Sequence, residues 1–136
     1  DGVGMQRHIA TTQPLEGDSG DMTAVRKVRD ELGQQNHVTE LDLGIAEGDT
    51  EESQGIYYQK FMEALLKEKI AGADITSVTF WGLTDGLSWR PGEQCLLFRD
   101  DLSRKPAFEG VVKAIGNTGA AIDKIKFIGK VDLTDS

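Results

Sequence analysis

The residues best suited to chemistry fall in three short stretches. One of them, TFWGLTDGLSWR (residues 79–90), places two tryptophans, an aspartate and an arginine around a bend marked by glycines. A buried indole needs a partner for its N–H, and Asp85 and Arg90 stand close to Trp81 and Trp89 in the sequence. The pattern indicates one wall of a polar binding site. The alternative is a core strand over residues 78–83 whose tryptophans only fill space.

A second stretch, HVTELDL (residues 37–43), carries two carboxylates at alternate positions. Because side chains alternate between the faces of a strand, Glu40 and Asp42 are expected to share one face with Val38. The other face would carry Thr39, Leu41 and Leu43, and its apolar pair, Leu41 and Leu43, suits packing against helices. Adjacent buried carboxylates repel and are costly unless paired or hydrogen-bonded, which favours a functional role. The alternative is that the strand ends at Leu41 and that Asp42 belongs to a loop.

The third stretch, DGVGMQRH (residues 1–8), places Gln6 and His8 on one face of a strand. A lone histidine is more often a structural group than a catalytic one. These two residues, however, join Glu40, Asp42 and Trp81 at or just past the carboxyl ends of expected strands. In α/β barrels, active sites are built at that end of the sheet.

Three strand–helix units are expected to position these side chains. Strands are predicted at residues 3–6, 37–43 and 75–83, and helices at residues 21–32, 54–70 and 105–115. The apolar residues at helical spacing are Met22, Val25, Val28 and Leu32, then Tyr57, Tyr58, Phe61, Met62, Leu65 and Leu66, then Phe108, Val111, Val112 and Ile115. Asp21 is the expected N-cap of the first helix, and Gly33 marks its end. This alternation predicts an α/β fold with parallel strands.

Composition narrows the partners. The chain has 136 residues, of which 38% are hydrophobic and 28% charged, with a formal net charge of −8. Such an acidic balance argues against nucleic acid or an anionic membrane as a partner, and no apolar run approaches the ~20 residues of a membrane span. A single cysteine, Cys95, excludes an internal disulfide, and with only two histidines it argues against a structural zinc site.

The two ends of the chain differ from this pattern. Residues 117–136 contain one alternating stretch, 122–131, which is either an extra strand or the start of a linker to another module. The chain begins abruptly, without an initiator methionine or a signal peptide, as expected of a chain entered in mid-domain.

Four motifs together carry a family resemblance. DGVGMQRH, VTELDL, TFWGLTDGLSWR and CLLFRDDLSRKPAF resemble, in order and rough spacing, the motifs of glycoside hydrolase family 10, the endo-β-1,4-xylanases. That family has a (β/α)8 TIM barrel. The resemblance implies that residues 1–116 are the C-terminal portion of such a catalytic barrel, about its last three βα units. Residues 117–136 would then be a C-terminal extension or linker, or one extra strand.

The resemblance also implies roles for individual residues. Glu40 matches the catalytic nucleophile, His8 the histidine that hydrogen-bonds to it, and Asp42 the carboxylate that supports this histidine. The positions lining the sugar subsite at the point of scission are matched by Gln6, Trp81 and Trp89. From its place beside the tryptophans, Arg90 is expected to join them in binding substrate. The chain departs from the family pattern at three non-catalytic positions, Arg7, Cys95 and Arg99, and Arg7 is expected to point away from the site.

A retaining glycosidase needs two carboxyl groups about 5–5.5 Å apart. The family's acid/base glutamate lies on an earlier strand, in an Asn-Glu motif that this sequence lacks. The expected function is therefore the nucleophile-bearing part of a secreted endo-1,4-β-xylanase. The resemblance implies that it would need no metal or cofactor, would act on xylan or xylo-oligosaccharides, and would be inactive without the missing N-terminal half of the barrel.

Two alternatives remain. One is a non-catalytic carbohydrate-binding or assembly fragment that self-associates through its open strand edges. The other is a related cellulase-type barrel, which the stretch TDGLSWR disfavours.

Overall fold

The computed structural model describes residues 1–12, 20–119 and 124–127. Their strands form one sheet of β1 (Gly2–Ala10), β2 (Gln35–Gly44), β3 (Ile75–Phe80) and β4 (Lys124–Phe127). The order is β1-β2-β3-β4, and each neighbouring pair is parallel. The chain crosses between the strands through α1 (Gly20–Lys27), α2 (Glu51–Ile70) and α3 (Pro106–Thr118). The predicted α/β fold with parallel strands is confirmed.

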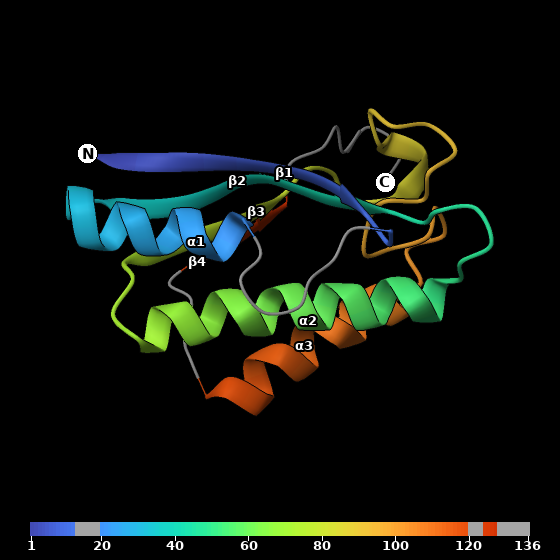
Figure 1. Ribbon diagram of the computed structural model, residues 1–136. Helices are drawn as coiled ribbons and strands as arrows, with labels where there is room; N and C mark the ends of the chain where they lie inside the picture. Colours follow the sequence, from blue (N-terminus) through green and yellow to red (C-terminus); the bar gives the residue numbers. More distant parts are fainter. Residues whose placement is uncertain (13–19, 120–123, 128–136) are drawn as a thin grey trace.

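The core lies between the sheet and the helices, which all lie on one side of it (Figure 1). Its largest buried apolar side chains come from every strand of β1–β3 and from α2: Ile9, Leu41, Leu43, Tyr58, Phe61, Met62, Leu65, Leu66, Ile75 and Phe80. On β1 the alternate residues Gly2, Gly4 and Gln6 are exposed. In a barrel, alternate residues of each strand face the interior of the barrel. Gln6 therefore lies on the side of the sheet that the helices do not cover, and this side carries the candidate site.

The first helix ends earlier than predicted. α1 stops at Lys27, and a π-helical turn, η1 (Val28–Leu32), follows it. Gly33 closes this turn at a φ of 60°, a left-handed conformation that suits glycine. Met22, Val25 and Val28 are buried as predicted, but Leu32 is 58% exposed. The π-turn breaks the helical spacing, so Leu32 falls outside the buried stripe.

Asp21 is not the N-cap of α1. It lies inside the first turn of the helix and pairs with Arg7 of β1, with the charged atoms 2.7 Å apart. A carboxylate in the first turn is stabilised by the helix dipole. The pair also shows that Arg7 points toward α1 and away from Gln6 and His8, as the sequence predicted.

α2 begins three residues earlier than predicted, because Thr50 caps it by accepting a hydrogen bond from the Ser53 amide at 3.1 Å. α3 begins at Pro106, which suits a first-turn position. Its predicted apolar face is wrong at Val112, which is 48% exposed. The face turned inward carries small residues instead: Ala107, Gly110 and Ala114 beside Val111.

A close approach of two glycines explains why α3 turns its small residues inward and leaves Val112 exposed. A Cβ added to Gly110 would lie 2.2 Å from the carbonyl oxygen of Gly55 on α2, so the two backbones touch at this point. Contact of this kind places the small residues of α3 against α2 and leaves Val112 outside.

The pairing of β1 with β2 departs from strict alternation. β1 continues to Ala10, so His8 lies within a paired strand, and Met5 faces Val38 while Gln6 faces Glu40. Thr39 is therefore skipped, as in a β-bulge. As a result, Val38 lies in the core with Leu41 and does not share the face of Glu40 and Asp42, contrary to the prediction.

The third and fourth strands complete the sheet. β3 ends at Phe80, three residues before the predicted end, so Trp81 follows the strand. β4 pairs in parallel with β3 from Ser77↔Lys124 to Phe80↔Phe127. β4 falls within the alternating stretch 122–131, and the rest of that stretch lies outside the described residues. Within the described part of the chain, no helix combines the length and apolar character that crossing a membrane requires.

Candidate active site

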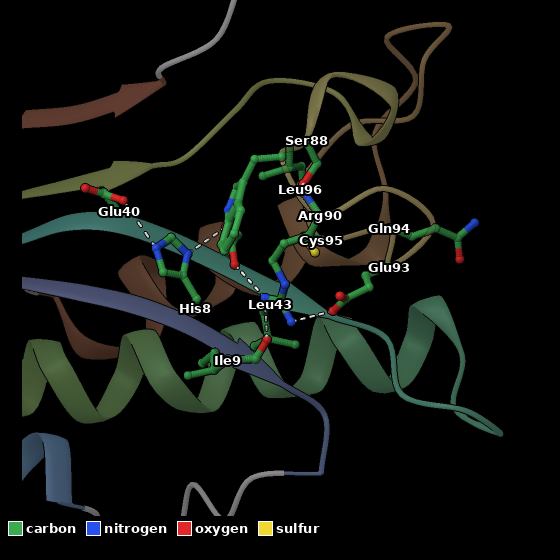
Figure 2. Close-up of polar contacts among 12 residues, drawn as sticks. His8, Ile9, Glu40, Leu43, Ser88, Arg90, Glu93, Gln94, Cys95 and Leu96 are labelled. Carbon is green, nitrogen blue, oxygen red and sulfur yellow. Dashed lines mark hydrogen bonds and ion pairs between the residues drawn. The ribbon is translucent and has the colours of Figure 1, made fainter.

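His8 lies between the two carboxylates of β2. Its Nδ1 is 2.9 Å from Oδ2 of Asp42, and its Nε2 is 3.2 Å from Oε2 of Glu40, a contact visible in Figure 2. The strand register produces this arrangement, because Gln6 pairs with Glu40 and His8 pairs with Asp42. Carboxylates only accept hydrogen bonds, so the ring donates to both when both of its nitrogens are protonated. The structure thus brings together the group that the sequence singled out.

Glu40 keeps access to solvent. Its Oε1 accepts a hydrogen bond from the Gln6 side-chain amide at 2.9 Å, and its other oxygen faces His8. Its side chain is 20% exposed. Each oxygen therefore has one donor that orients it, while the carboxylate retains lone pairs that can react.

Asp42 is in the opposite situation, because its side chain is fully buried. Oδ2 accepts from the Trp89 indole N–H at 2.9 Å and lies equally close to His8. Oδ1 accepts from Nη1 of Arg90 at 2.6 Å. A buried carboxylate is costly unless it is paired and hydrogen-bonded, and the cation with its two further donors meets that requirement.

Arg90 links Asp42 to two other segments. Nη1 also donates to the backbone oxygen of Ile9 on β1 at 3.0 Å, and Nη2 donates to Glu93 at 2.5 Å, as Figure 2 shows. Burial lowers the pKa of Arg90, but its hydrogen bonds and charge interactions, with those of Asp42 and Glu93 among them, outweigh burial and raise the pKa overall. The guanidinium is therefore a permanent cation of the site.

The two tryptophans have different surroundings. Trp89 is 59% exposed, and its ring meets the ring of His8 edge-on, with centroids 4.9 Å apart. Trp81 is half-buried just after β3, where its backbone N–H donates to the oxygen of Leu41 at 2.9 Å. Trp89 stands near Asp85 in the sequence, but its indole N–H donates to Asp42 on β2.

Asp85 anchors the loop between β3 and α3. It accepts from the Leu96 amide at 2.9 Å, and its Oδ2 lies 2.9 Å from Nζ of Lys105, which is fully buried. Lys105 also donates to the backbone oxygen of Gln94 at 2.7 Å. No pattern in the sequence pointed to Lys105 as a partner of Asp85. Its only signal was its place directly before Pro106, where α3 begins. Lys105 is twenty residues from Asp85, which is too far apart for a local sequence pattern to pair them.

Behind Asp42 the protein is closed to solvent. Tyr58 and Cys95 are both fully buried, and the Tyr58 hydroxyl donates to the backbone oxygen of Cys95 at 2.6 Å. Burial raises the pKa of Tyr58 well above its usual range and raises the pKa of the Cys95 thiol to about 11. Neither group ionises near neutral pH, so this side of the site contributes no charge.

Fold and site together define a class of protein. The polar group spans the carboxyl ends of neighbouring parallel strands, which is where (β/α)8 barrels place their active sites. The chain is part of such a barrel.

Comparison with known proteins then gives the family. The chain belongs to glycosyl hydrolase family 10, whose family model matches residues 1–114. Among curated relatives, endo-1,4-β-xylanase B of Butyrivibrio fibrisolvens is 35% identical over 122 residues, which cover 84% of this chain and 19% of the relative. The chain therefore spans only about a fifth of that relative's length.

Solved structures agree. An intracellular xylanase of Thermoanaerobacterium saccharolyticum, determined as a mutant in complex with xylotetraose, matches with a TM-score of 0.69 at 30% identity. The match covers 82% of this chain and 33% of that one. A family 10 xylanase from termite gut that contains a bacterial Ig-like domain matches with a TM-score of 0.74 at 26% identity, covering 88% and 30% of the two chains.

Proposed function

We propose that this chain is the C-terminal part of an endo-1,4-β-xylanase in which Glu40 is the nucleophile of a retaining hydrolysis. The observation that carries the proposal is the solvent-accessible Glu40 carboxylate, which is held by Gln6 and His8 in a chain of glycosyl hydrolase family 10. Relatives of known structure have been crystallised with xylotetraose and xylopentaose, which supports xylan or xylo-oligosaccharides as substrates.

In the proposed reaction, an oxygen of Glu40 attacks the anomeric carbon of a xylose unit while the glycosidic bond to the leaving sugar breaks. A general acid protonates that leaving oxygen. The acid then acts as a base and removes a proton from water, which attacks the same carbon and releases Glu40. Gln6 and His8 hold the carboxylate in line, and Trp89 offers an exposed indole for the apolar face of a sugar ring.

The general acid belongs, in this proposal, to a part of the barrel outside this chain. Asp42 is unsuited to the role because it is buried, stands on the same strand as Glu40 and already accepts from Trp89 and Arg90. A general acid must reach the leaving oxygen with a proton to give. The isolated chain is therefore expected to be inactive, and the missing N-terminal half of the barrel is its principal partner. Secretion of the whole enzyme belongs to the same proposal if polymeric xylan is the substrate, whereas xylo-oligosaccharides would suit an intracellular enzyme such as the Thermoanaerobacterium saccharolyticum relative.

The experiment is to supply the missing strands from a family 10 relative, fused or as a second polypeptide, and to assay an aryl β-xylobioside. Replacing Glu40 with alanine should abolish turnover, and added azide should restore release of the aryl group and yield the α-glycosyl azide. Azide would then occupy the space left by the carboxylate and attack the face that Glu40 attacks. Glu47→Ala, an exposed glutamate in the loop after β2, is the matched control and should keep normal activity. A folded barrel that hydrolyses the substrate equally well with Glu40→Ala would contradict the proposal.

A second candidate is a non-catalytic carbohydrate-binding or assembly fragment. It is favoured by the large exposed area of Trp89 and by the edge strand β1, which pairs only with β2 among the described strands. Sedimentation of the isolated chain and its tryptophan fluorescence during xylo-oligosaccharide titration test this candidate. A compact monomer whose fluorescence is unchanged by sugar excludes it.

A further inference from the structure

We propose that Arg90 is a positioning residue that holds Asp42, and through it His8 and Trp89, in the geometry that Glu40 needs. The inference rests on the proposed function, because it concerns the same site. It assigns Arg90 a role inside the protein, whereas the sequence alone suggested contact with substrate.

The contacts of Arg90 support this role. Both of its terminal nitrogens are directed at the protein: Nη1 at Asp42 and the oxygen of Ile9, and Nη2 at Glu93. Its side chain is only 14% exposed. Three of the four terminal N–H groups of the guanidinium are occupied in this way, which leaves it little with which to bind a sugar hydroxyl.

The contacts of Asp42 show how the effect reaches Glu40. Arg90 occupies Oδ1, which turns Oδ2 toward both the Trp89 indole and His8. His8 in turn faces Glu40 through its other nitrogen. Without the cation, a fully buried carboxylate would lose its ion pair and would reorient or take up a proton. Either change alters the hold on His8 and on the Trp89 ring together.

The backbone leaves room for this arrangement. A Cβ added to Gly44, at the end of β2, would lie 2.8 Å from Oε2 of Glu93 and 3.1 Å from Nη2 of Arg90. Arg90 therefore ties together the ends of β1 and β2 and the loop after β3, which are the three segments that carry His8, Asp42 and Trp89.

The first test uses the chain as it is. The chain has two histidines, and His37 contacts Ser77 and Thr76, residues of β3 that belong to no part of this group. We expect Arg90→Met to shift the ring ¹⁵N resonances of His8 and the indole resonance of Trp89, while those of His37 stay unchanged. Arg99→Met is the matched control, since Arg99 lies in the same loop but pairs with Glu51, and it should leave His8 and Trp89 unchanged.

Arg90→Lys separates positioning from folding, because it keeps the charge but loses the planar fork. In the completed barrel we expect it to lower kcat about 10-fold, since small misplacements of a reacting group are costly. KM should rise by a smaller factor than kcat falls, because Arg90 itself does not contact substrate and only the shift of Trp89 reaches the sugar. A loss confined to KM, or unchanged His8 and Trp89 resonances in folded Arg90→Met, would overturn the proposal. If Arg90→Met does not fold, Arg90→Lys decides by the same resonances.

The two proposals fail in different ways. A completed wild-type barrel without xylan hydrolysis overturns the proposed function, whereas the resonances still decide the role of Arg90, because they need no substrate. Hydrolysis with normal kcat in Arg90→Lys and unmoved resonances overturns the positioning role alone.

Discussion

Glu40 and Asp42 are two carboxylates on the same strand with opposite surroundings. The Glu40 side chain is 20% exposed and faces Gln6, which has an uncharged amide, and His8, which has an imidazole. Asp42 is fully buried and faces a permanent cation, Arg90, as well as Trp89 and His8.

The difference shows how one strand provides both a reactive and a structural group. A carboxylate whose lone pairs are already satisfied by buried donors gains nothing by attacking a substrate. A carboxylate with one donor on each oxygen is oriented and still accessible. We therefore expect changes at Glu40 to affect chemistry with little effect on folding. Changes at Asp42 should affect folding strongly and reach the chemistry only through His8.

The largest expected effect is at Glu40. In the completed barrel, Glu40→Gln should lower kcat by about 10⁴- to 10⁶-fold, as the loss of a nucleophile does in other enzymes. The free energy of unfolding of the isolated chain should change by less than about 1 kcal/mol, because the side chain is partly exposed. Steady-state kinetics and urea unfolding measure the two quantities. A large loss of stability would remove the distinction between the two carboxylates.

Asp42→Asn should lower the free energy of unfolding of the isolated chain much more than Glu40→Gln does. Asp42→Asn removes the fully buried anion that pairs with Arg90 and leaves only the exposed Glu93 as a partner, and breaking a buried pair costs about 3 kcal/mol. Urea unfolding followed by tryptophan fluorescence measures this cost. Glu93→Gln removes the other, more exposed partner of Arg90, whose side chain is 49% exposed, and it should cost less than about 1 kcal/mol. Equal effects of the two changes would contradict the assigned difference in burial.

Gly44→Ala tests the site without changing any of its side chains. The new methyl group would meet the ends of Glu93 and Arg90, and we expect a destabilisation of about 1 kcal/mol because flexible side chains can move aside. The His8 resonances should move in the same direction as in Arg90→Lys. Unmoved resonances would show that the site tolerates displacement of Arg90.

The smallest expected effect concerns Cys95, behind Asp42. Its pKa is raised from 9.0 to about 11 by burial, so the folded state holds the proton more tightly than the unfolded state. Its contribution to stability is complete below about pH 9 and is lost as the pH rises toward 11. Tyr58 has the same sign, so the readout is the difference between wild type and Cys95→Ala. We expect the wild type to lose more stability between pH 9 and pH 11, and parallel curves would contradict this.

The same thiol gives a simpler check. Native Cys95 should resist alkylation at pH 8 and react rapidly in urea, because the thiolate is the reactive form. Rapid reaction in the native protein would show that this side of the site is open.

Part of the fold and of the candidate site could be predicted, because it depends on the local pattern of apolar and polar residues. Strand periodicity placed Gln6 with His8 and Glu40 with Asp42, and strand–helix alternation placed both pairs at the same edge of a parallel sheet. No long-range knowledge is needed for such an arrangement, because neighbouring parallel strands bring their carboxyl ends together. The motifs then indicated the family, and the match of the family model to residues 1–114 confirms it.

Other features had no such signal. Val38 was assigned to the wrong face because alternation cannot predict a bulge at Thr39, which arises from pairing with β1. Val112 was assigned to the core because periodicity does not reveal that Gly55 and Gly110 bring two helices into backbone contact.

The sequence by itself determined the strands, their edge and the chemical types gathered there. Only the tertiary structure decided that Trp89 and Arg90, 47 and 48 residues beyond Asp42, are its partners. The loop that carries them has no period, and its course depends on Asp85 and a buried Lys105 on its far side. Contacts between segments so distant in sequence form only once the core has brought the strand ends and the loop together.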